Sequence, residues 1–465
     1  MKPMPRPVAT LVDGEFHPAL PPGDPWVDQA TSGLDLVRVM RRLGQNPIGV
    51  LGASLLTKPH TVFDLGRRKF MYVQSPDLIR EAFVEKREHL TFNPIRQSIL
   101  KPIIRDGLIA AEGEPWRRAR HAATPIFTPR AVGRFADCMR ETAQDFVERQ
   151  PDSQDVSLDA WASELTYGVL KSALFSDTLS ADADSVTEAL ARVLSQMGRP
   201  DLADLLRLPG WVPRLSKLGG QKDVEAFRSL VRETINKRKE GVPGDDLLGL
   251  LLSARAEDGS ALSSEELEDN VVSFVGAGHE TTARWLVWWL YLLSQDATVR
   301  ERVEAEADAL DVGSDPADWK DRLPFLFATL EEALRLYPSA PMLSRSIAKD
   351  VTIGGVELPV GSDLVVNIMA VHRHRDLWDT PDAFRPERFL GQARERIGRF
   401  QYLPFGVGHR VCIGQRFAVQ EAVILGALVF RGLRFDYMGE ADPWPVMRVT
   451  ISADNGMPMR VTRRR

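Results

Sequence analysis

The stretch FGVGHRVCIG, from Phe405 to Gly414, sets one cysteine in a glycine-rich loop. Gly406 and Gly408 open backbone conformations that other residues avoid, so the chain can curl tightly before Cys412. In such a curl, peptide N–H groups can point at the sulfur and stabilise its negative charge. A helix is expected to start at the cysteine, and its dipole also favours a thiolate there. The loop therefore predicts a single, rigidly held thiolate.

The composition is that of a soluble globular protein. Of 465 residues, 44% are apolar and 26% are charged, and the net charge of −5 gives no reason to expect a nucleic-acid partner. Residues 1–20 are broken by prolines and charges and lack the apolar core of a signal peptide. The apolar run at 286–293 is much shorter than the roughly 20 residues of a membrane-spanning helix. With only two cysteines, we expect a cytoplasmic protein in a reducing compartment, without a transmembrane anchor.

Helical patterns dominate the chain. The longest runs for about 30 residues from Ser263, where Ser263 and Glu266 make a capping box. We therefore expect a fold that is mainly α with small β-sheets, in a single domain over residues 1–465. We predict helices at 221–240, 263–294, about 324–337 and about 413–430, and strands at 71–73, 351–358 and 363–369.

A lone thiolate narrows the chemistry of the loop. A thiolate can act as a nucleophile or bind zinc, iron or a cluster, but zinc and clusters need several cysteines or histidines at short spacing. Cys138 lies far upstream, and we expect it to be a buried structural thiol. Phe405 can shield the sulfur of Cys412, Gly414 lets a flat ligand approach, and Arg410 can pair with a ligand carboxylate. This combination suits an axial ligand of haem iron.

The loop fits F-x-x-G-x-R-x-C-x-G at every defined position. This is the haem-binding signature of the cytochrome P-450 family, which the chain resembles over roughly residues 90–415. The resemblance implies the cytochrome P-450 fold, with a long central helix crossing over the haem. It also implies haem b as cofactor and Cys412 as the iron ligand, with Phe405, Arg410 and Gly414 among the cofactor-binding residues.

Inside the predicted long helix lies AGHETT, residues 277–282. The glycines on either side of Ala277 weaken the helix; taken alone, they also fit close helix packing. The segment resembles the family's A-G-x-(D/E)-T motif. The resemblance implies that Ala277 lies beside the haem, that Thr281 hydrogen-bonds dioxygen, and that Glu280 feeds protons toward it. His279 stands at a variable position, and we treat it as structural or solvent-facing.

Two further patterns resemble family motifs. Glu332 and Arg335, at i and i+3 among leucines, resemble E-x-x-R, and Arg388 in FRPERF matches the arginine that completes a buried charge cluster with them. The resemblance implies that this cluster fixes the loop before Cys412. Trp116 and Arg120 share a helix face, and the resemblance implies that both hold a haem propionate.

Other polar residues are less specific. Arg345 stands at a position that often contacts a propionate, although a surface ion pair fits it equally well. Arg96 and Arg105 can bind a substrate carboxylate, but a solvated role is favoured. The histidines of HRHR, residues 372–375, share a face of an extended segment, yet no third metal ligand is evident. The substrate-contacting stretches implied by the family are rich in Ile, Leu, Pro and Met, which favours an apolar substrate: 92–108, 190–215, 272–276, 339–343 and 455–457.

The sequence thus predicts a monooxygenase that inserts one oxygen atom from O2 into a small apolar substrate, by hydroxylation or epoxidation. About 50 residues follow Cys412, without a flavin or ferredoxin segment. Electrons are therefore expected from a ferredoxin or flavodoxin with its NAD(P)H-dependent reductase. We expect the donor to dock on the thiolate side, at Arg117, Arg118, His121, His409 and Arg416. A peroxide-driven enzyme and a non-enzymatic haem sensor or carrier are the alternatives.

Overall fold

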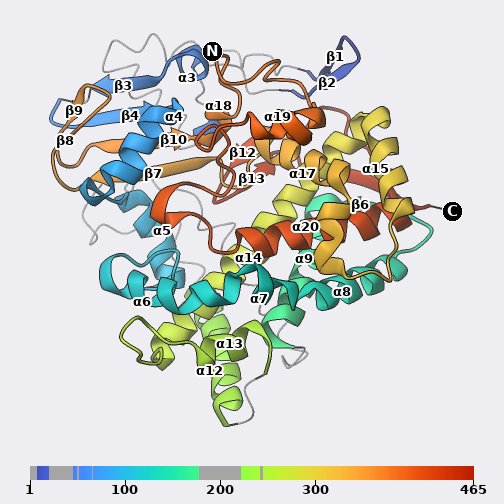
Figure 1. Cartoon of the computed structure of the whole chain (residues 1–465), viewed down its shortest axis with the longest axis horizontal. Coiled ribbons are helices and arrows are strands. Elements are labelled where there is room, and N and C mark those ends of the chain that lie inside the picture. Colours follow the sequence, from blue (N-terminus) through green and yellow to red (C-terminus); the bar gives the residue numbers. More distant parts are fainter. Residues whose placement is uncertain are drawn as a thin grey trace.

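The computed structural model describes residues 8–19, 46–49, 52–64, 66–176, 221–240 and 244–464. A sheet-rich part and a helix-rich part lie side by side (Figure 1). Strands from the two ends of the chain meet in the sheet-rich part, where blue N-terminal strands neighbour orange C-terminal ones. The prediction of a mainly α fold with small sheets is confirmed.

The largest sheet has the strand order β3-β4-β10-β7-β5. Only β4 and β10 run parallel to each other; the other neighbours are antiparallel. Alternation along β4 explains its two-sided burial: Met71 and Val73 enter one apolar cluster and Tyr72 enters another. The strands are β3 His60–Asp64, β4 Lys69–Val73, β5 Leu90–Phe92, β7 Met342–Ile347 and β10 Asp363–Asn367.

The predicted strand at 363–369 is two residues too long. The side chain of Asn367 accepts a hydrogen bond from the N–H of Ala370, so a short helix, α18 (Ile368–Val371), begins directly after β10. The predicted strand at 351–358 is instead a hairpin of β8 (Val351–Ile353) and β9 (Val356–Leu358). Gly354 and Gly355 form its turn, both with positive φ.

Helix α14 (Ser264–Gln295) crosses the molecule. Its N-terminus carries the predicted capping box, in which Ser263 and Glu266 exchange hydrogen bonds. At Gly278 it packs closely on α9 (Leu158–Phe175), because a Cβ there would lie 3.1 Å from Leu170. Its C-terminal half, with Trp285 and Leu286 to Leu293, is buried in the main core.

The remaining helices surround α14. Three of them match the predicted ranges: α12 Gln221–Glu240, α17 Pro324–Leu336 and α20 Gln415–Gly432, which begins two residues later than predicted. The other α-helices among the described residues are α3 Ala53–Thr57, α4 Pro76–Arg80, α5 Pro94–Ile104, α6 Gly113–Ala123, α7 Pro129–Gly133, α8 Ala136–Glu148, α13 Leu247–Ser253, α15 Ala297–Ala309, α16 Trp319–Arg322 and α19 Gly391–Glu395.

Three small sheets lie outside the largest one and the β8–β9 hairpin. They are the β1–β2 hairpin, a three-stranded sheet β11-β14-β6 and the β12–β13 hairpin. Their strands are β1 Thr10–Val12, β2 Glu15–His17, β6 Ser153–Ser157, β11 Leu433–Tyr437, β12 Pro445–Met447, β13 Ile451–Ala453 and β14 Pro458–Arg463. Within the described ranges, no helix combines the length and the apolar character needed to cross a bilayer.

Candidate functional site

The cysteine loop is curled as its glycines predict. Gly406 and Gly408 have φ values of +81° and +72°. A Cβ on Gly408 would lie 2.5 Å from the carbonyl oxygen of Phe83, so only glycine fits there. The N–H of Cys412 donates to the carbonyl of Phe405 at 2.9 Å, which closes the curl. The loop therefore presents the thiol in one fixed direction.

The Cys412 sulfur receives backbone N–H groups from Gly414 and Gln415, at the start of α20. Burial raises the pKa of the Cys412 thiol, while these two amides and the charge of Arg120 act in the opposite direction. The thiol nevertheless has exposed surface, because it lines a groove of about 1430 Å³. A sulfur in this setting becomes a stable thiolate once a metal ion binds it.

The space around the sulfur suits a flat ligand. A Cβ on Gly414 would lie 4.0 Å from both the Cys412 sulfur and the ring of Phe127, so this wall of the site is open. The ring of Phe405 packs edge-on against Trp285 of α14 at 6.1 Å between centroids, beside the loop. The structure thus joins the thiol loop to the crossing helix through an aromatic contact.

A cluster of arginines converges on one aromatic ring near the loop. The guanidinium carbons of Arg96, Arg345 and Arg410 lie 4.1, 4.8 and 4.6 Å from the centre of the Phe92 ring. Burial lowers the pKa of these arginines to about 9, about 10 and about 10, and their mutual repulsion lowers those of Arg96 and Arg410 further. The negative charge of Glu112 acts in the opposite direction and raises the pKa of all three arginines. The cluster therefore carries a surplus of positive charge that calls for an anionic ligand.

This cluster settles two open predictions about arginines. Arg345 is 8% exposed, and its Nη1 donates to the carbonyl of Ser344, so the surface ion pair is wrong for it. The solvated role is wrong for Arg96, which donates to the carbonyl of Ile109 inside the cluster. Arg105 is different, because it is half-exposed and faces Glu225 and Glu268 away from this cluster. A charge pattern in sequence could not separate Arg96 from Arg105.

Trp116 and Arg120 both reach the loop from α6. The ring of Trp116 lies 4.1 Å from the Arg410 guanidinium and packs edge-on against His409. Arg120 Nη1 donates to the carbonyl of Val411 at 3.0 Å. Both residues therefore brace the segment directly before Cys412, and the remaining donors of Arg120 are left for another acceptor.

Along α14, exposure changes at the AGHETT segment. Residues 271–275 are buried, whereas 276–278, 280 and 281 are half-buried, so the helix opens toward a space there. Thr281 Oγ1 donates to the carbonyl of Ala277 at 2.7 Å, and Glu280 Oε1 accepts from the Thr450 hydroxyl at 2.8 Å. His279 is 5% exposed, with Nδ1 3.0 Å from the carbonyl of Val275, which confirms its structural role.

These residues fit a haem. The thiol is set to bind a metal, the glycine side of the loop admits a flat ring, and the surplus positive charge matches the two propionates. Comparison with known proteins agrees, since residues 56–456 match the family described as Cytochrome P450. The chain belongs to the cytochrome P450 family.

The relatives of this cytochrome P450 include several oxygenases. It is 31% identical to "Pentalenene oxygenase" of Streptomyces avermitilis, covering 78% of this chain and 81% of the relative. It is 28% identical to "Carotene epsilon-monooxygenase, chloroplastic" of Arabidopsis thaliana, covering 86% and 78%. A solved structure, the cytochrome P450DA heme domain, superposes with a TM-score of 0.76 at 26% identity, covering 99% and 97%. The protein is therefore a cytochrome P450 monooxygenase with the fold of that family.

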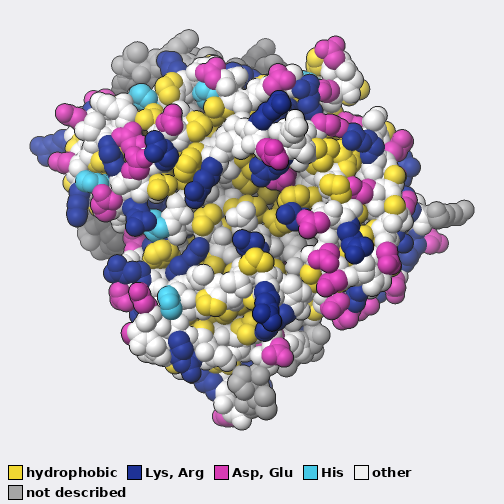
Figure 2. All heavy atoms as spheres, in the orientation of Figure 1, with side chains coloured by type: hydrophobic (Ala, Val, Ile, Leu, Met, Phe, Trp, Pro, Cys, Tyr) yellow, Lys and Arg dark blue, Asp and Glu magenta, His cyan; other side chains and the backbone are white. Residues whose placement is uncertain are grey.

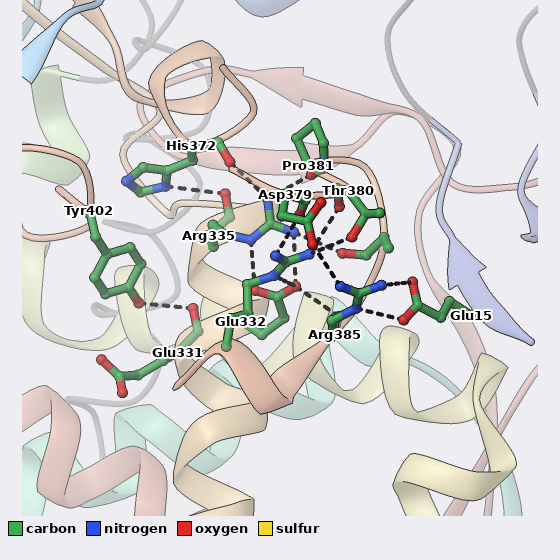
Figure 3. Close-up of polar contacts among 12 residues, drawn as sticks. Glu15, Glu331, Glu332, Arg335, His372, Asp379, Thr380, Pro381, Arg385 and Tyr402 are labelled. Atoms are coloured by element: carbon green, nitrogen blue, oxygen red, sulfur yellow. Dashed lines mark hydrogen bonds and ion pairs between the residues drawn. The ribbon is translucent and has the colours of Figure 1, made fainter. Parts of the chain in front are cut away.

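The predicted ion pair of this P450 is fully buried (Figure 3). Glu332 and Arg335 are fully buried and joined by two hydrogen bonds, of 2.6 and 2.8 Å. Arg388 donates to Glu332 at 3.1 Å, as predicted. Arg335 also donates to the carbonyls of His372, Pro381 and Ala383, and the N–H of Arg385 donates to Glu332. The pair therefore organises the segments that lead to the thiol.

Other sequence predictions are corrected or confirmed by the contacts. The histidines of HRHR are structural. His372 Nδ1 faces the carbonyl of Arg335, and His374 Nε2 faces the carbonyl of Lys58. No cluster of metal-ligating side chains occurs in the described ranges. Arg118, which was predicted to lie on the docking face, forms ion pairs with Asp258 and Glu266. Cys138 is half-buried rather than buried. The proposed substrate stretch 190–215 lies outside the described residues.

Proposed function

We propose that this P450 holds haem b through Cys412 and inserts one atom of O2 into an apolar substrate, by hydroxylation or epoxidation. The observation that carries the proposal is the Cys412 loop, in which one thiol receives two backbone amides and lines the groove. When bound, the haem iron supplies the site at which dioxygen is reduced with two electrons and two protons, giving the oxygenated product and water.

The arginine cluster is proposed to fix the orientation of the haem. Arg96, Arg345 and Arg410 would donate charge-assisted hydrogen bonds to its propionates, while Trp116 packs on the Arg410 guanidinium and Arg120 holds the Val411 carbonyl. Phe405 restricts water near the sulfur. Ala277 and Gly276 leave room beside the helix, where larger side chains would fill the half-buried opening.

Glu280 and Thr281 are proposed to deliver the protons. The Thr281 hydroxyl donates its proton to the Ala277 carbonyl, so Oγ1 keeps lone pairs that can accept a hydrogen bond. A proton taken up by Glu280 can reach Thr281 by rotation of the side chain or through one water. This pair favours O2-driven over peroxide-driven chemistry, because a peroxide-driven reaction brings its own protons.

The substrate is proposed to be largely hydrocarbon. Stretches 92–108 and 339–343, which the family resemblance places at the substrate, are rich in Ile, Leu and Pro. Two relatives are named for the hydrocarbons pentalenene and carotene. Because an apolar pocket discriminates weakly between similar hydrocarbons, the proposal names a class of substrate rather than one compound. An optical titration with fatty acids, terpenes, steroids and aromatics would identify its members through the change in iron spin state.

The electron donor is proposed to be a ferredoxin or flavodoxin that docks over the thiolate groove. Figure 2 shows apolar side chains in the hollowed middle of this face, with Lys and Arg around it. Six cations and four carboxylates line the groove, which is a local exception to the net negative charge of the chain. The cations are Arg120, Arg130, Lys320, Arg394, Arg399 and Arg416, and the carboxylates are Asp318, Asp321, Glu331 and Glu395.

Two measurements test this function. Reduced protein with carbon monoxide should show the red-shifted band of a thiolate-bound haem; Cys412→Ser should lose it and Cys138→Ser should keep it. Turnover should require NAD(P)H, reductase and ferredoxin or flavodoxin. Faster turnover with hydrogen peroxide alone would identify a peroxide-driven enzyme instead. The bacterial type and the cytoplasmic location stay predictions, since the relatives come from Streptomyces and from plants alike.

A further inference from the structure

Glu280 and Arg284 form an open ion pair on α14. Opposite charges at i and i+4 on a helix are neighbours that normally close on each other. Here Arg284 Nε lies 4.0 Å from Glu280 Oε1 and makes no hydrogen bond, although it is buried. Something therefore holds the two side chains apart.

Two neighbours from other elements compete for the pair. Asp159, in the first turn of α9, hydrogen-bonds the Arg284 guanidinium through Nη1. Thr450, in the turn between β12 and β13, is 4% exposed and donates to Glu280 Oε1 at 2.8 Å. Each competitor satisfies one member of the pair, so neither member needs to move toward the other.

The surroundings of Glu280 leave its second oxygen available. Oε2 of Glu280 makes no hydrogen bond with any described residue, and it does not belong to the fully buried atoms. His279, the adjacent side chain, adds no competing cation, because burial lowers its pKa. Glu280, Arg284 and Asp159 have side-chain exposures of 19%, 17% and 22%, so water can reach all three.

The same hairpin also anchors Thr281. The N–H of Ile451 donates to the carbonyl of Ser339 at 3.0 Å, and the Ser339 hydroxyl donates to the carbonyl of Thr281 at 2.8 Å. The β12–β13 hairpin thus contacts both residues of the proposed proton-delivery path: it reaches Glu280 through Thr450, and Thr281 through Ser339.

We propose that Thr450 and Asp159 are positioning residues that keep Glu280 from closing on Arg284. A closed arginine–carboxylate pair would occupy the carboxylate with donors and hold it as an anion. The open pair instead leaves Oε2 free to exchange a proton with water and then with Thr281. This inference rests on the proposed proton delivery by Glu280. It adds the two residues that keep the Glu280 carboxylate able to exchange a proton.

The haem-loaded enzyme gives a direct test that requires no substrate. The infrared carboxylate band of Glu280 is identified as the band that disappears in Glu280→Gln. In Thr450→Val, which removes the hydroxyl and keeps the shape, this band should shift to the position of an arginine-paired carboxylate. Thr450→Ser should restore the original band, and Ser452→Ala, in the same hairpin, should leave it unchanged. An unshifted band in Thr450→Val would overturn the proposal.

A second arm tests Asp159 and the link to turnover. Asp159→Asn should produce the same band shift, because Arg284 is released toward Glu280. It should also lower the product formed per NAD(P)H by several-fold, measured with the panel compound that changes the iron spin state most. Adding Arg284→Gln should restore that yield. If Glu280→Gln turns over normally, the proton-delivery role itself fails. If Glu280→Gln is impaired while Asp159→Asn and Thr450→Val are normal, only the positioning role fails.

Discussion

The imidazole of His372 joins the buried ion pair to the thiolate loop. Its Nδ1 lies 3.2 Å from the carbonyl of Arg335, and its Nε2 accepts the N–H of Leu403 at 2.8 Å (Figure 3 shows the Arg335 side). Since Nε2 accepts, Nδ1 must carry the proton, and the ring is neutral. Leu403 stands two residues before Phe405, so this uncharged ring links the buried ion pair to the segment that leads into the loop.

The neutral state of His372 should make stability depend on pH. Burial, reinforced by Arg335 and Arg373, lowers its pKa to about 3 in the folded protein, against about 6.5 in the unfolded chain. Between these values the unfolded chain binds the extra proton, so stability falls as the pH falls, by up to about 1.4 kcal/mol per pH unit. The stabilising effect is complete above about pH 6.5.

Thermal unfolding between pH 4 and 8 checks this dependence. As the pH is lowered, the midpoint temperature of unfolding should fall less in His372→Gln than in the wild type. His121→Gln, at an exposed histidine, serves as the control and should follow the wild type. If the unfolding midpoint fell equally with decreasing pH in the wild type and in His372→Gln, the conclusion that His372 is neutral in the folded protein would be contradicted.

The Glu332–Arg335 pair should be costly to break. Arg335→Met leaves Glu332 buried with only the Arg388 side chain as a cation, and we expect a loss of about 3–5 kcal/mol together with little haem-loaded protein. Arg385→Met removes a side chain whose pair with Glu15 is half-exposed, which should cost below about 1 kcal/mol. Equal destabilisation by both variants, in chemical unfolding, would show that burial does not decide the effect.

Arg96 should help to retain the haem, although its spacing in sequence gave no sign of it. Arg96→Gln removes a charge-assisted donor, and haem transfer to an acceptor protein should become roughly tenfold faster or more. Arg105→Gln is the matched control, because Arg105 lies nine positions away and contacts Glu225 and Glu268 instead. Similar transfer rates for both variants would remove Arg96 from the propionate cluster.

Proton delivery through Glu280 and Thr281 predicts two different defects. Thr281→Ala should consume NAD(P)H while releasing more hydrogen peroxide and less product. Glu280→Gln should slow turnover by roughly tenfold or more, with a larger solvent isotope effect. Ser294→Ala loses a hydroxyl of the same helix that is bonded to the carbonyl of Tyr291, away from the AGHETT segment and the substrate stretches, and it should behave as wild type. Normal rate and yield in both variants would exclude the relay.

Docking of an acidic electron donor should depend on Arg416. This residue is exposed at the first turn of α20 and lines the thiolate groove. Arg416→Glu should slow the first electron transfer several-fold, and the wild-type rate should fall as ionic strength rises. Lys58→Glu makes the same charge change outside the groove and should leave the rate unaltered. If Arg416→Glu accepted the first electron at the wild-type rate, the donor would not dock on this groove.

Local chemistry decided what the sequence could predict. The glycines around Cys412, the capping box at Ser263 and the prolines that bound the helix at 324–336 act over a few residues, so their effects can be read directly. The motifs around Cys412, Glu280 and Glu332 were located for the same reason, since each needs a fixed spacing on one loop or one helix turn.

Contacts between distant segments could not be predicted in this way. Arg96 and Arg105 look alike in sequence, and only the arrangement of β5, β7 and α5 brings Arg96 to Arg345. Arg118 was expected on a docking face, but the fold places it against Asp258 and Glu266. His372 and Thr450 carry no sequence pattern that links them to Leu403 or Glu280.

The sequence by itself therefore determined the thiolate loop, the crossing helix and the chemistry of their residues, because these depend on spacings within single elements. Only the tertiary structure decided which charges are buried together and which hydrogen bonds hold Glu280 and the loop in place. Burial and the pairing of remote groups depend on packing between elements, and packing fixes both the surplus charge at Phe92 and the open pair between Glu280 and Arg284.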